Sequence, residues 1–333
     1  MAQNEAPIIL DETEQKIIDI IDAHRDQIIN FAKDIYTHAE LGYKEFRTAE
    51  KFANFMKALG LSTKEHLAVT GVKAYLNEEK KDNISLALIG ELDALRIPEH
   101  KYANPETQGA HCCGHHAQLA GVIGAAIALT NPEVKEKLDG QVVLFAVPAE
   151  EYGEIEFKNK LTDEGKIKYG GGKCELIRIG AFDDIDLDIV HHIGDKDISG
   201  GSTDVGDVQH IQPVLTFNTG GKVSGLHSVD FDIVDDELAY VVTAKIFALS
   251  AYRLLKNDAE KAKEVVENYH PIFTKDAYIQ YMNSFISVEG GSPTEINAPR
   301  GCAVILRRIC QLSLTRITHQ VSRAFDLNLR IIY

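Results

Sequence analysis

The sequence predicts an α/β protein, a three-layer sandwich around a mixed, mostly parallel central sheet. Nearly continuous apolar runs at 84–89 and 141–147 are typical of strands that are buried on both faces. Helical patterns lie around these runs, and strands that alternate with helices favour a parallel sheet. Polar residues follow the runs directly. Because ligand sites in open α/β sheets lie at the carboxyl ends of strands, the same pattern predicts where a functional site should be.

Hydrophobic periodicity gives the elements expected along the chain. Asp11 and Glu14 resemble a capping box that opens one long amphipathic helix at 13–39. A second helix begins at Thr48 and ends at Gly60. The small apolar residues of 117–129 predict a helix packed inside the protein. The remaining expectations are a half-exposed strand at 72–76, a loop or short hairpin at 152–173, a helix at 174–179, strands at 188–190 and 214–217, a turn at 200–204, and helices at 238–255 and 259–268.

Composition limits the class of protein. The chain has 333 residues, of which 44% are hydrophobic and 26% are charged, and this is ordinary globular composition. A formal net charge of −15 argues against nucleic acid or an anionic membrane as a partner. Residues 1–10 carry no signal-peptide pattern, and no stretch approaches the roughly 20 apolar residues of a spanning helix. Five cysteines indicate thiols kept reduced, so we expect a cytoplasmic protein with no membrane partner.

The run Gly-Ala-His-Cys-Cys-Gly-His-His at 109–116 is the strongest chemical signal. Thiolate and imidazole are the ligands that borderline divalent ions prefer. The glycine between Cys113 and His115 lets the chain fold back and aim the sulfur and a ring nitrogen at one point. The alternative is a buried cysteine pair with satisfied histidines. Three histidines and two cysteines in six positions favour a metal site.

Glu150 and Glu151 follow the apolar run 141–147 closely. Beside a metal, one carboxylate can bind the ion while its neighbour stays free as a general base. A solvated acidic loop is the alternative interpretation. Asp93 and the pair His191-His192 are expected at two other strand ends. The chain has no Gly-x-Ser-x-Gly, P-loop or dinucleotide fingerprint, and the acidic pair favours metal-assisted hydrolysis over nucleophilic attack by Cys113.

Three ordered motifs resemble one known superfamily. Gly-Glu-Leu-Asp-Ala-Leu at 90–95, His-Cys-Cys-Gly-His at 111–115 and Pro-Ala-Glu-Glu at 148–151 are similar to the metal-dependent amidohydrolases of the aminoacylase and carboxypeptidase superfamily. The branch is the one that holds N-acyl-amino-acid, indole-acetyl-amino-acid and aminobenzoyl-glutamate hydrolases. The resemblance covers about residues 13–283. It implies a phosphorylase/hydrolase-like catalytic domain that hydrolyses the amide bond to an amino acid, with a small N-acyl amino acid or peptide-like molecule as substrate.

The resemblance also implies roles for individual residues. Two divalent ions, of Zn, Mn, Co or Ni, would be bound by Cys113, His115, Glu151, His192 and His227, with Glu150 as the general base. His191 competes with His192 for its role, and Asp93 matches a family acid near the site. His116 stands where many members carry Asp, so we expect the surroundings of the ligands to differ here.

Compared with the family, this sequence lacks one long segment. The family inserts a lid and dimerisation domain between the regions that match His192 and Ser202, and here only residues 193–201 lie there. We therefore expect a catalytic domain at 1–283 without its lid, a monomer or weak homodimer with impaired turnover. The alternative is a metal-binding remnant without catalytic activity. Residues 284–333 hold six Arg and no Lys, whereas 1–283 hold 24 Lys and five Arg. We interpret this tail as atypical and non-native, the alternative being a basic C-terminal arm.

Overall fold

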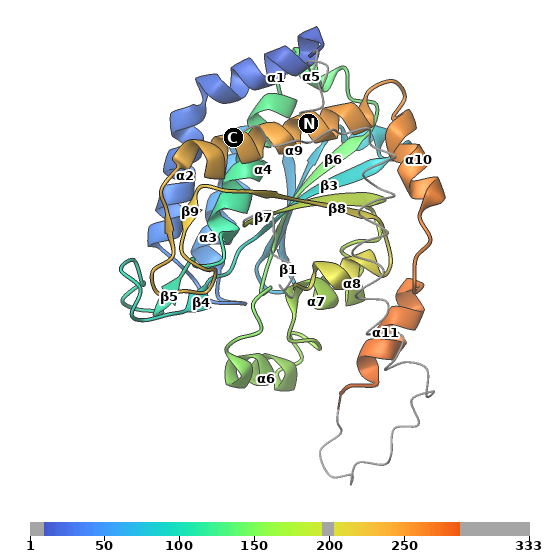
Figure 1. The fold of residues 1–333 in the computed structure, drawn as a ribbon. Coiled ribbons are helices and arrows are strands. Elements are labelled where there is room, and N and C mark those ends of the chain that lie inside the picture. The colour runs from blue at the N-terminus through green and yellow to red at the C-terminus, as the bar shows by residue number, and fades with distance from the viewer. Residues whose placement is uncertain (1–9, 195–202, 287–333) are drawn as a thin grey trace, which may run out of the picture.

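The computed structural model describes residues 10–194 and 203–286. They form a central sheet with helices on both faces, which confirms the predicted fold class (Figure 1). The helices are α1 (Glu12–Ala23), α2 (Arg25–Thr37), α3 (Phe46–Ala58), α4 (His115–Leu129), α5 (Pro132–Lys135), α6 (Ile155–Asp163), α7 (Gly172–Arg178), α8 (Val205–Gln209), α9 (Val242–Leu255), α10 (Glu260–Asn268) and α11 (Lys275–Asn283), with a 3-10 turn at Glu78–Lys80 and a π-helical turn at Glu237–Val241. The strands are β1 (Ser62–Leu67), β2 (Gly71–Leu76), β3 (Ser85–Glu91), β4 (Leu95–Arg96), β5 (Gly109–Ala110), β6 (Gln141–Val147), β7 (Leu187–Ile193), β8 (Val214–Thr219), β9 (Lys222–Val223) and β10 (Asp232–Ile233).

The main sheet has six strands in the order β1-β2-β6-β3-β7-β8. The four strands β6, β3, β7 and β8 run parallel to one another. At one side of the sheet β2 pairs antiparallel with β6, and β1 pairs antiparallel with β2. The carboxyl ends of β6, β3 and β7 therefore meet at one edge of the sheet. This edge is where chemistry-bearing side chains from distant parts of the sequence come together.

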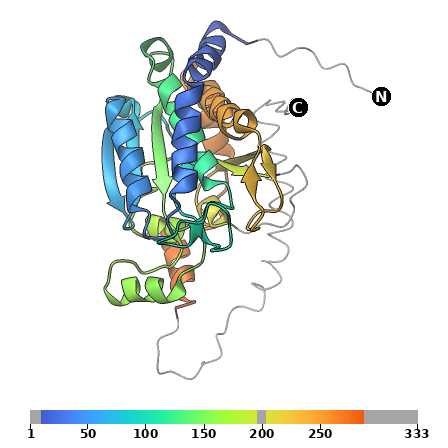
Figure 2. The same cartoon turned by 90° about the vertical axis from the view of Figure 1, so that its left-hand side faces the viewer.

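Alternate side chains of the central strands feed two separate cores. In β3, Leu86 and Leu88 pack with α1–α4, α9 and α10, whereas Ala87 and Ile89 pack with α6, α7, α8 and α11 on the other face. Every residue of α4 is buried, which explains its lack of a polar face. Figure 2 shows the N-terminal helices layered on one side of the sheet and α6 projecting from the body.

The predicted N-terminal helix is wrong in one respect, since it is two helices. The capping box at Asp11 and Glu14 is confirmed. At His24, however, φ is −106° and ψ is 13°, so the backbone leaves the helical region and α2 begins at the next residue. Both halves bury their apolar stripes in the same core. The break lets α1 and α2 follow the curved surface of that core, which the periodicity alone does not reveal.

Other differences concern burial and length. The strand expected to be half-exposed is β2, which is buried throughout because its side chains pack into the cores on both faces of the sheet. The loop expected at 152–173 contains α6. The strand expected at 188–190 extends to Ile193, because its pairing with β8 continues to Thr219. The histidine pair therefore lies within the strand instead of after it. The elements β1, α8 and α11 have no counterpart in the sequence-based expectations.

One helical stretch of the described residues, Glu237–Leu255, is long and apolar enough to cross a membrane by length and composition alone. The sequence analysis expected no such stretch. In the fold, 67% of its most apolar window is buried inside the protein. Its side chains belong to the main core, so the apolarity is that of a core helix.

Parts of three expectations, in two segments of the chain, lie outside the described residues. The short segment in place of a lid, 193–201, and the turn at 200–204 fall mostly within 195–202. The C-terminal tail is described only to residue 286. The interpretation of both segments stays a prediction.

Candidate metal centre

The turn at Gly114 positions the first two predicted ligands. Gly114 has φ +95°, and a Cβ there would lie 2.9 Å from the Cβ of Ile193. Both features require glycine. The left-handed residue lies between Cys113 and His115, and α4 starts at His115, whose side chain is buried. The sequence-based interpretation of the Cys-Gly-His spacing agrees with this local geometry.

A second tight turn carries the acidic pair. Ala149 has φ +49° although it is not glycine. Gly172, at the start of α7, packs so closely on this turn that a Cβ would lie 1.6 Å from the carbonyl oxygen of Pro148. The backbone N–H of Glu151 donates to Oδ2 of Asp93 at 2.9 Å. Packing and hydrogen bonding thus fix where both glutamates point.

Three side chains form what we call the outer cluster: Cys113, Glu151 and His227, each with one ligand atom within 4.8 Å of the others. Nε2 of His227 lies 3.3 Å from Oε1 of Glu151. The contacts of His227 with Cys113 and Glu151 raise the pKa of His227 to about 10. Burial opposes ionisation of Glu151, yet the close contact with His227, followed by the nearby His115, keeps the pKa of Glu151 lowered.

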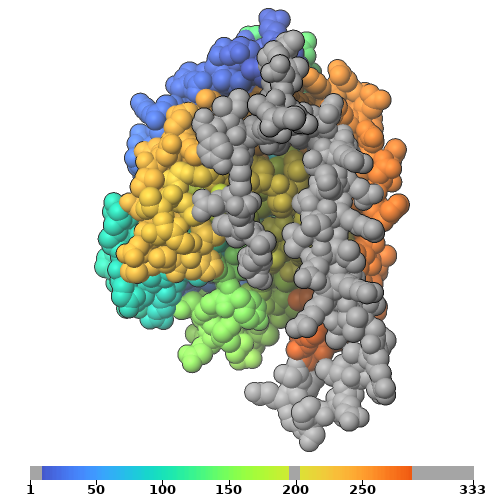
Figure 3. Space-filling model, in the orientation of Figure 1, coloured from blue at the N-terminus to red at the C-terminus, as the bar shows by residue number. Residues whose placement is uncertain are grey.

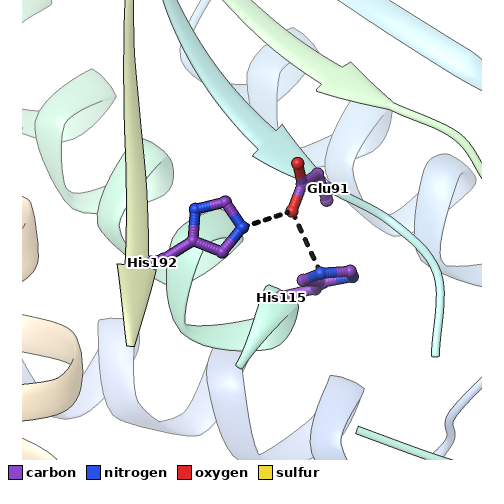
Figure 4. A group of neighbouring side chains, drawn as sticks. All are labelled: Glu91, His115 and His192. Atoms are coloured by element: carbon purple, nitrogen blue, oxygen red, sulfur yellow. Dashed lines mark ion pairs between the residues drawn. The ribbon is translucent and has the colours of Figure 1, made fainter. Parts of the chain in front are cut away.

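Three others form what we call the inner cluster: Glu91, His115 and His192 (Figure 4). Oε2 of Glu91 lies 3.0 Å from Nε2 of His115 and 3.5 Å from Nε2 of His192. Burial opposes protonation of His115, but the nearby Cys113 and Glu91 raise the pKa of His115 well above its usual value. Cys113 belongs to the outer cluster with His227 and also contacts His115 of the inner cluster. Its thiol therefore lies between the two clusters.

Glu150 lies next to both clusters. Its Oε2 is 3.7 Å from Nε2 of His115, and its side chain is only 6% exposed. Burial, followed by the negative charge of Glu91, raises the pKa of Glu150 to about 8. A carboxyl group in this position can accept a proton near neutral pH.

The structure separates the two neighbouring histidines of β7. Successive strand residues point to opposite faces. His191 is fully buried in the core, where its Nε2 lies 2.7 Å from Oγ1 of Thr219, and His192 faces Glu91. Of the two candidates, His192 therefore joins the cluster. His116 does not join either cluster, since its ring stacks on Tyr36 with centroids 4.5 Å apart.

The residues present fit a pair of divalent ions. Nε2 of His115 and Oε1 of Glu151 are buried and make no hydrogen bond of standard geometry among the described residues, although Oε2 of Glu91 lies 3.0 Å from the first and Nε2 of His227 lies 3.3 Å from the second. Leaving such atoms unpaired is costly, and a cation would satisfy both. Nδ1 of His115 lies 2.8 Å from the carbonyl oxygen of Asp93, an arrangement that orients a metal-binding imidazole. Thiolate, imidazole and carboxylate together suit zinc and its neighbours.

Sequence reasoning missed three residues of the site. Glu91 shares the strand-end signal of Asp93, so its position could have indicated it. Lys173 and Asp204 gave no local signal. Nζ of Lys173 is fully buried between Oε1 of Glu91 and Oδ1 of Asp204, 2.5 Å from each. Only the folding of α7 and of the residues after 202 onto the sheet edge brings this cation to the site.

Fold and site together define an α/β protein with two adjoining clusters of thiol, imidazole and carboxylate side chains at the carboxyl edge of its sheet. The family model described as Peptidase family M20/M25/M40 matches residues 87–312. The chain belongs to this family, as the motifs of the sequence indicate.

Individual relatives are similar over part of their length. An IAA-amino acid hydrolase of Arabidopsis thaliana (ILR1-like 5) is 35% identical over 133 residues, which are 38% of this chain and 29% of that protein. A subunit of the p-aminobenzoyl-glutamate hydrolase of Escherichia coli is 26% identical over 182 residues, which are 53% of this chain and 34% of the relative. The chain thus matches less than half the length of these curated relatives.

A solved structure shows the same fold. The YXEP protein of Bacillus subtilis, described as a dinuclear metal-binding peptidase from the M20 family, superposes with a TM-score of 0.58 at 15% sequence identity. The alignment covers 70% of this chain and 99% of that chain. This similarity confirms the architecture of the domain.

Proposed function

We propose that this chain is a metal-dependent hydrolase of the amide bond to an amino acid, with two divalent ions held by the outer and inner clusters. The observation that carries the proposal is the position of Glu150. It is buried beside both clusters, 3.7 Å from the ligand nitrogen of His115, while its neighbour Glu151 belongs to the outer cluster. The relatives described as hydrolases of amino acid conjugates support the same reaction class.

The residues divide the chemistry between them. Bound divalent ions would polarise the amide carbonyl and lower the pKa of water to about 7. Glu150 takes the proton from the attacking water and delivers it to the leaving nitrogen. Asp93 orients the site, since its carbonyl oxygen meets His115 and its carboxylate meets the N–H of Glu151. The ions can be Zn, Mn, Co or Ni, because each accepts this mixed ligand set.

A cavity beside the acidic pair offers room for a small substrate. Its volume is about 600 Å³, within the range of ordinary small-molecule pockets. Its walls include Glu150, Glu151 and His227, together with Tyr152, which precedes α6, and Phe285, which follows α11. Figure 3 shows the light-green segment around α6 and the orange-red α11 at the same end of the molecule. The apolar walls would receive the acyl group.

One cation lines this cavity in a position to receive the substrate carboxylate. Lys168 is exposed and has no ion pair within the described residues. We expect Lys168→Ala to raise KM for an N-acyl amino acid about five- to tenfold, and to leave KM for the matching amino acid amide unchanged. Lys166→Ala is the matched control, because Lys166 pairs with Glu164. Equal KM changes for both substrates would remove Lys168 from carboxylate recognition.

The decisive experiment measures metal content and turnover together. The chain is loaded with each of the four metals and assayed on a panel of N-acyl amino acids. Hydrolysis that requires metal supports the proposal. Two bound ions without turnover on any substrate would leave the metal-binding remnant as the correct interpretation.

The missing lid bears on how fast such an enzyme works. Lids exclude water and help hold the substrate in a reactive pose. We propose an open site, a monomeric or weakly dimeric chain and slow turnover, with a cytoplasmic location testable by cell fractionation. Inserting a relative's lid between His192 and Ser202 is expected to raise turnover by orders of magnitude. If the chain without a lid already matches a lidded relative in rate, the lid is dispensable here.

A further inference from the structure

We propose that Glu91 is a sixth protein ligand, which completes the inner half of the metal centre. The proposal rests on the metal-binding part of the proposed function and does not depend on turnover. Without Glu91 the inner cluster would offer only the two imidazoles of His115 and His192, with Cys113 at its border. With Glu91, each half of the centre has one carboxylate of its own.

The distances match those between ligands of a single ion. Two ligand atoms about 2.1 Å from one tetrahedral ion lie roughly 3.4 Å apart. Oε2 of Glu91 lies 3.0 Å from Nε2 of His115 and 3.5 Å from Nε2 of His192 (Figure 4). The three side chains already point at a common centre from β3, β7 and the start of α4. Small adjustments would place an ion between them.

The ring nitrogen of His115 that Glu91 faces shows whether Glu91 is placed as a metal ligand or only as a group that orients the histidine. A carboxylate that orients a metal-binding histidine contacts the ring nitrogen that points away from the ion. For His115 that nitrogen is Nδ1, which already lies 2.8 Å from the carbonyl oxygen of Asp93 and 3.3 Å from its carboxylate. Glu91 instead faces the buried Nε2 at 3.0 Å, and this nitrogen makes no hydrogen bond of standard geometry among the described residues. Its oxygen therefore occupies the side of the ring on which the ion would bind.

The surrounding side chains fix the carboxylate in this orientation. Glu91 is fully buried, and its Oε1 pairs with Nζ of Lys173 at 2.5 Å. Nε2 of Gln118 donates to Oε2 at 2.8 Å, and the backbone N–H of Glu91 donates to the side-chain oxygen of Gln118. Because Lys173 engages Oε1, only Oε2 is directed at the imidazoles. We therefore expect Glu91 to bind through a single oxygen.

Buried charge gives a reason for the carboxylate. A divalent ion taken out of water needs negative ligands to offset the loss of hydration. The outer cluster offers the carboxylate of Glu151 besides Cys113. The inner cluster is the more buried of the two, and without Glu91 its own two imidazoles would be neutral, with the next carboxylates, those of Glu150 and Glu151, 3.7 and 4.0 Å from Nε2 of His115. The negative charge of Glu91 therefore lies where a bound ion would be most deeply buried. The ion pair with Lys173 holds the Glu91 side chain in this orientation.

Cobalt titration of Glu91→Gln tests the ligand role, with bound metal counted by elemental analysis and coordination followed by visible absorption. The unaltered chain is expected to bind two ions. Glu91→Gln should keep the ion of the outer cluster and bind the second at least about tenfold more weakly. Asp188→Asn is the matched control, since Asp188 is a buried carboxyl group of β7 outside both clusters, and it should bind two ions normally. Unchanged affinity for both ions in Glu91→Gln would overturn the proposal.

A crystal structure of the unaltered chain with cobalt or zinc bound tests the same point without a variant. Anomalous scattering locates each ion. Oε2 of Glu91 within about 2.0–2.2 Å of the ion that binds His115 and His192 supports the proposal. An ion on both histidines with that oxygen beyond about 3 Å overturns it, as does a chain that binds no metal. If Glu91 binds an ion but no substrate is hydrolysed, only the proposed function fails.

Discussion

The two halves of the metal centre are built in different ways. The inner cluster comes from two central strands and the first residue of α4, and its side chains are 0% exposed for Glu91, 1% for His115 and 22% for His192. The outer cluster comes from loops. There the side chain of Glu151 is 12% exposed and that of His227 is 50% exposed.

The backbone shows the same contrast. His227 has φ +59°, an uncommon value for a non-glycine residue, and its N–H donates to the carbonyl oxygen of Cys112 at 2.9 Å. The inner residues belong to regular elements packed in the core. We infer that the inner half is formed by folding itself, whereas the outer half depends more on the ion. Changes in the inner half should therefore affect stability, and changes in the outer half mainly metal affinity.

The largest expected effect is that of Lys173→Met on stability. Lys173 is fully buried between Glu91 and Asp204, and its removal leaves two buried carboxylates without their cation. Breaking a buried pair in this way costs about 3–5 kcal/mol in the free energy of unfolding. Urea denaturation of the metal-free chain measures it. Lys166→Met, at an exposed pair, should change stability by less than about 0.5 kcal/mol. Similar values for the two variants would refute the contrast.

Glu150→Gln is expected to affect chemistry alone. Glu150 borders both clusters, and the amide keeps its shape but cannot take a proton. Turnover should fall by about 100-fold or more, as is typical for loss of a general base, with two ions still bound. Steady-state kinetics beside elemental analysis give the answer. Undiminished turnover in a fully metal-loaded variant would show that another group is the base.

His227→Ala should weaken the outer half without loosening the fold. Its side chain is half exposed, so the free energy of unfolding of the metal-free chain should fall by less than in Lys173→Met, although contacts with Cys113 and Glu151 stabilise the charged imidazole. Affinity for one of the two ions should fall by at least about tenfold. His24→Ala provides the control, because His24 is exposed and outside both clusters. A strongly destabilised His227→Ala chain would mean that the outer half, too, is part of the core.

The smallest effect is a dependence on pH, because solvent around the half-exposed His227 screens its contacts. Contacts with Cys113 and Glu151 raise the pKa of His227 to about 10 in the metal-free chain, above the value of about 6.5 for an unfolded histidine. A raised pKa adds stability below about pH 6.5 that is lost as pH rises through about 10. The stability of the metal-free chain relative to His227→Ala should fall across that window. Metal affinity should rise there, because binding displaces the proton. A pKa near 6.5 by NMR titration would contradict this.

Several features of the fold could be predicted from the sequence because they depend on local patterns. The apolar runs at 84–89 and 141–147 became β3 and β6, since a run apolar on both faces can only be a buried strand or helix segment. The break at His24 and the helix α6 could not be predicted. The first depends on the curvature of the core that α1 and α2 cover, and the second on a short, polar sequence with little periodicity.

For the site, local sequence was enough to identify the groups that are contiguous in the chain. One is the Cys-Gly-His turn, which glycine at φ +95° permits. The other is the Glu150-Glu151 pair at a strand end. The other groups depend on the fold. The pairing of β7 with β8 extends the strand through the histidine pair, and strand alternation then sends His191 to the core and His192 to the site. Glu91 and Lys173 meet although 82 residues separate them. Neighbouring residues set the backbone conformation, but only packing and strand register decide which distant side chains share a buried space, because those contacts depend on the whole chain.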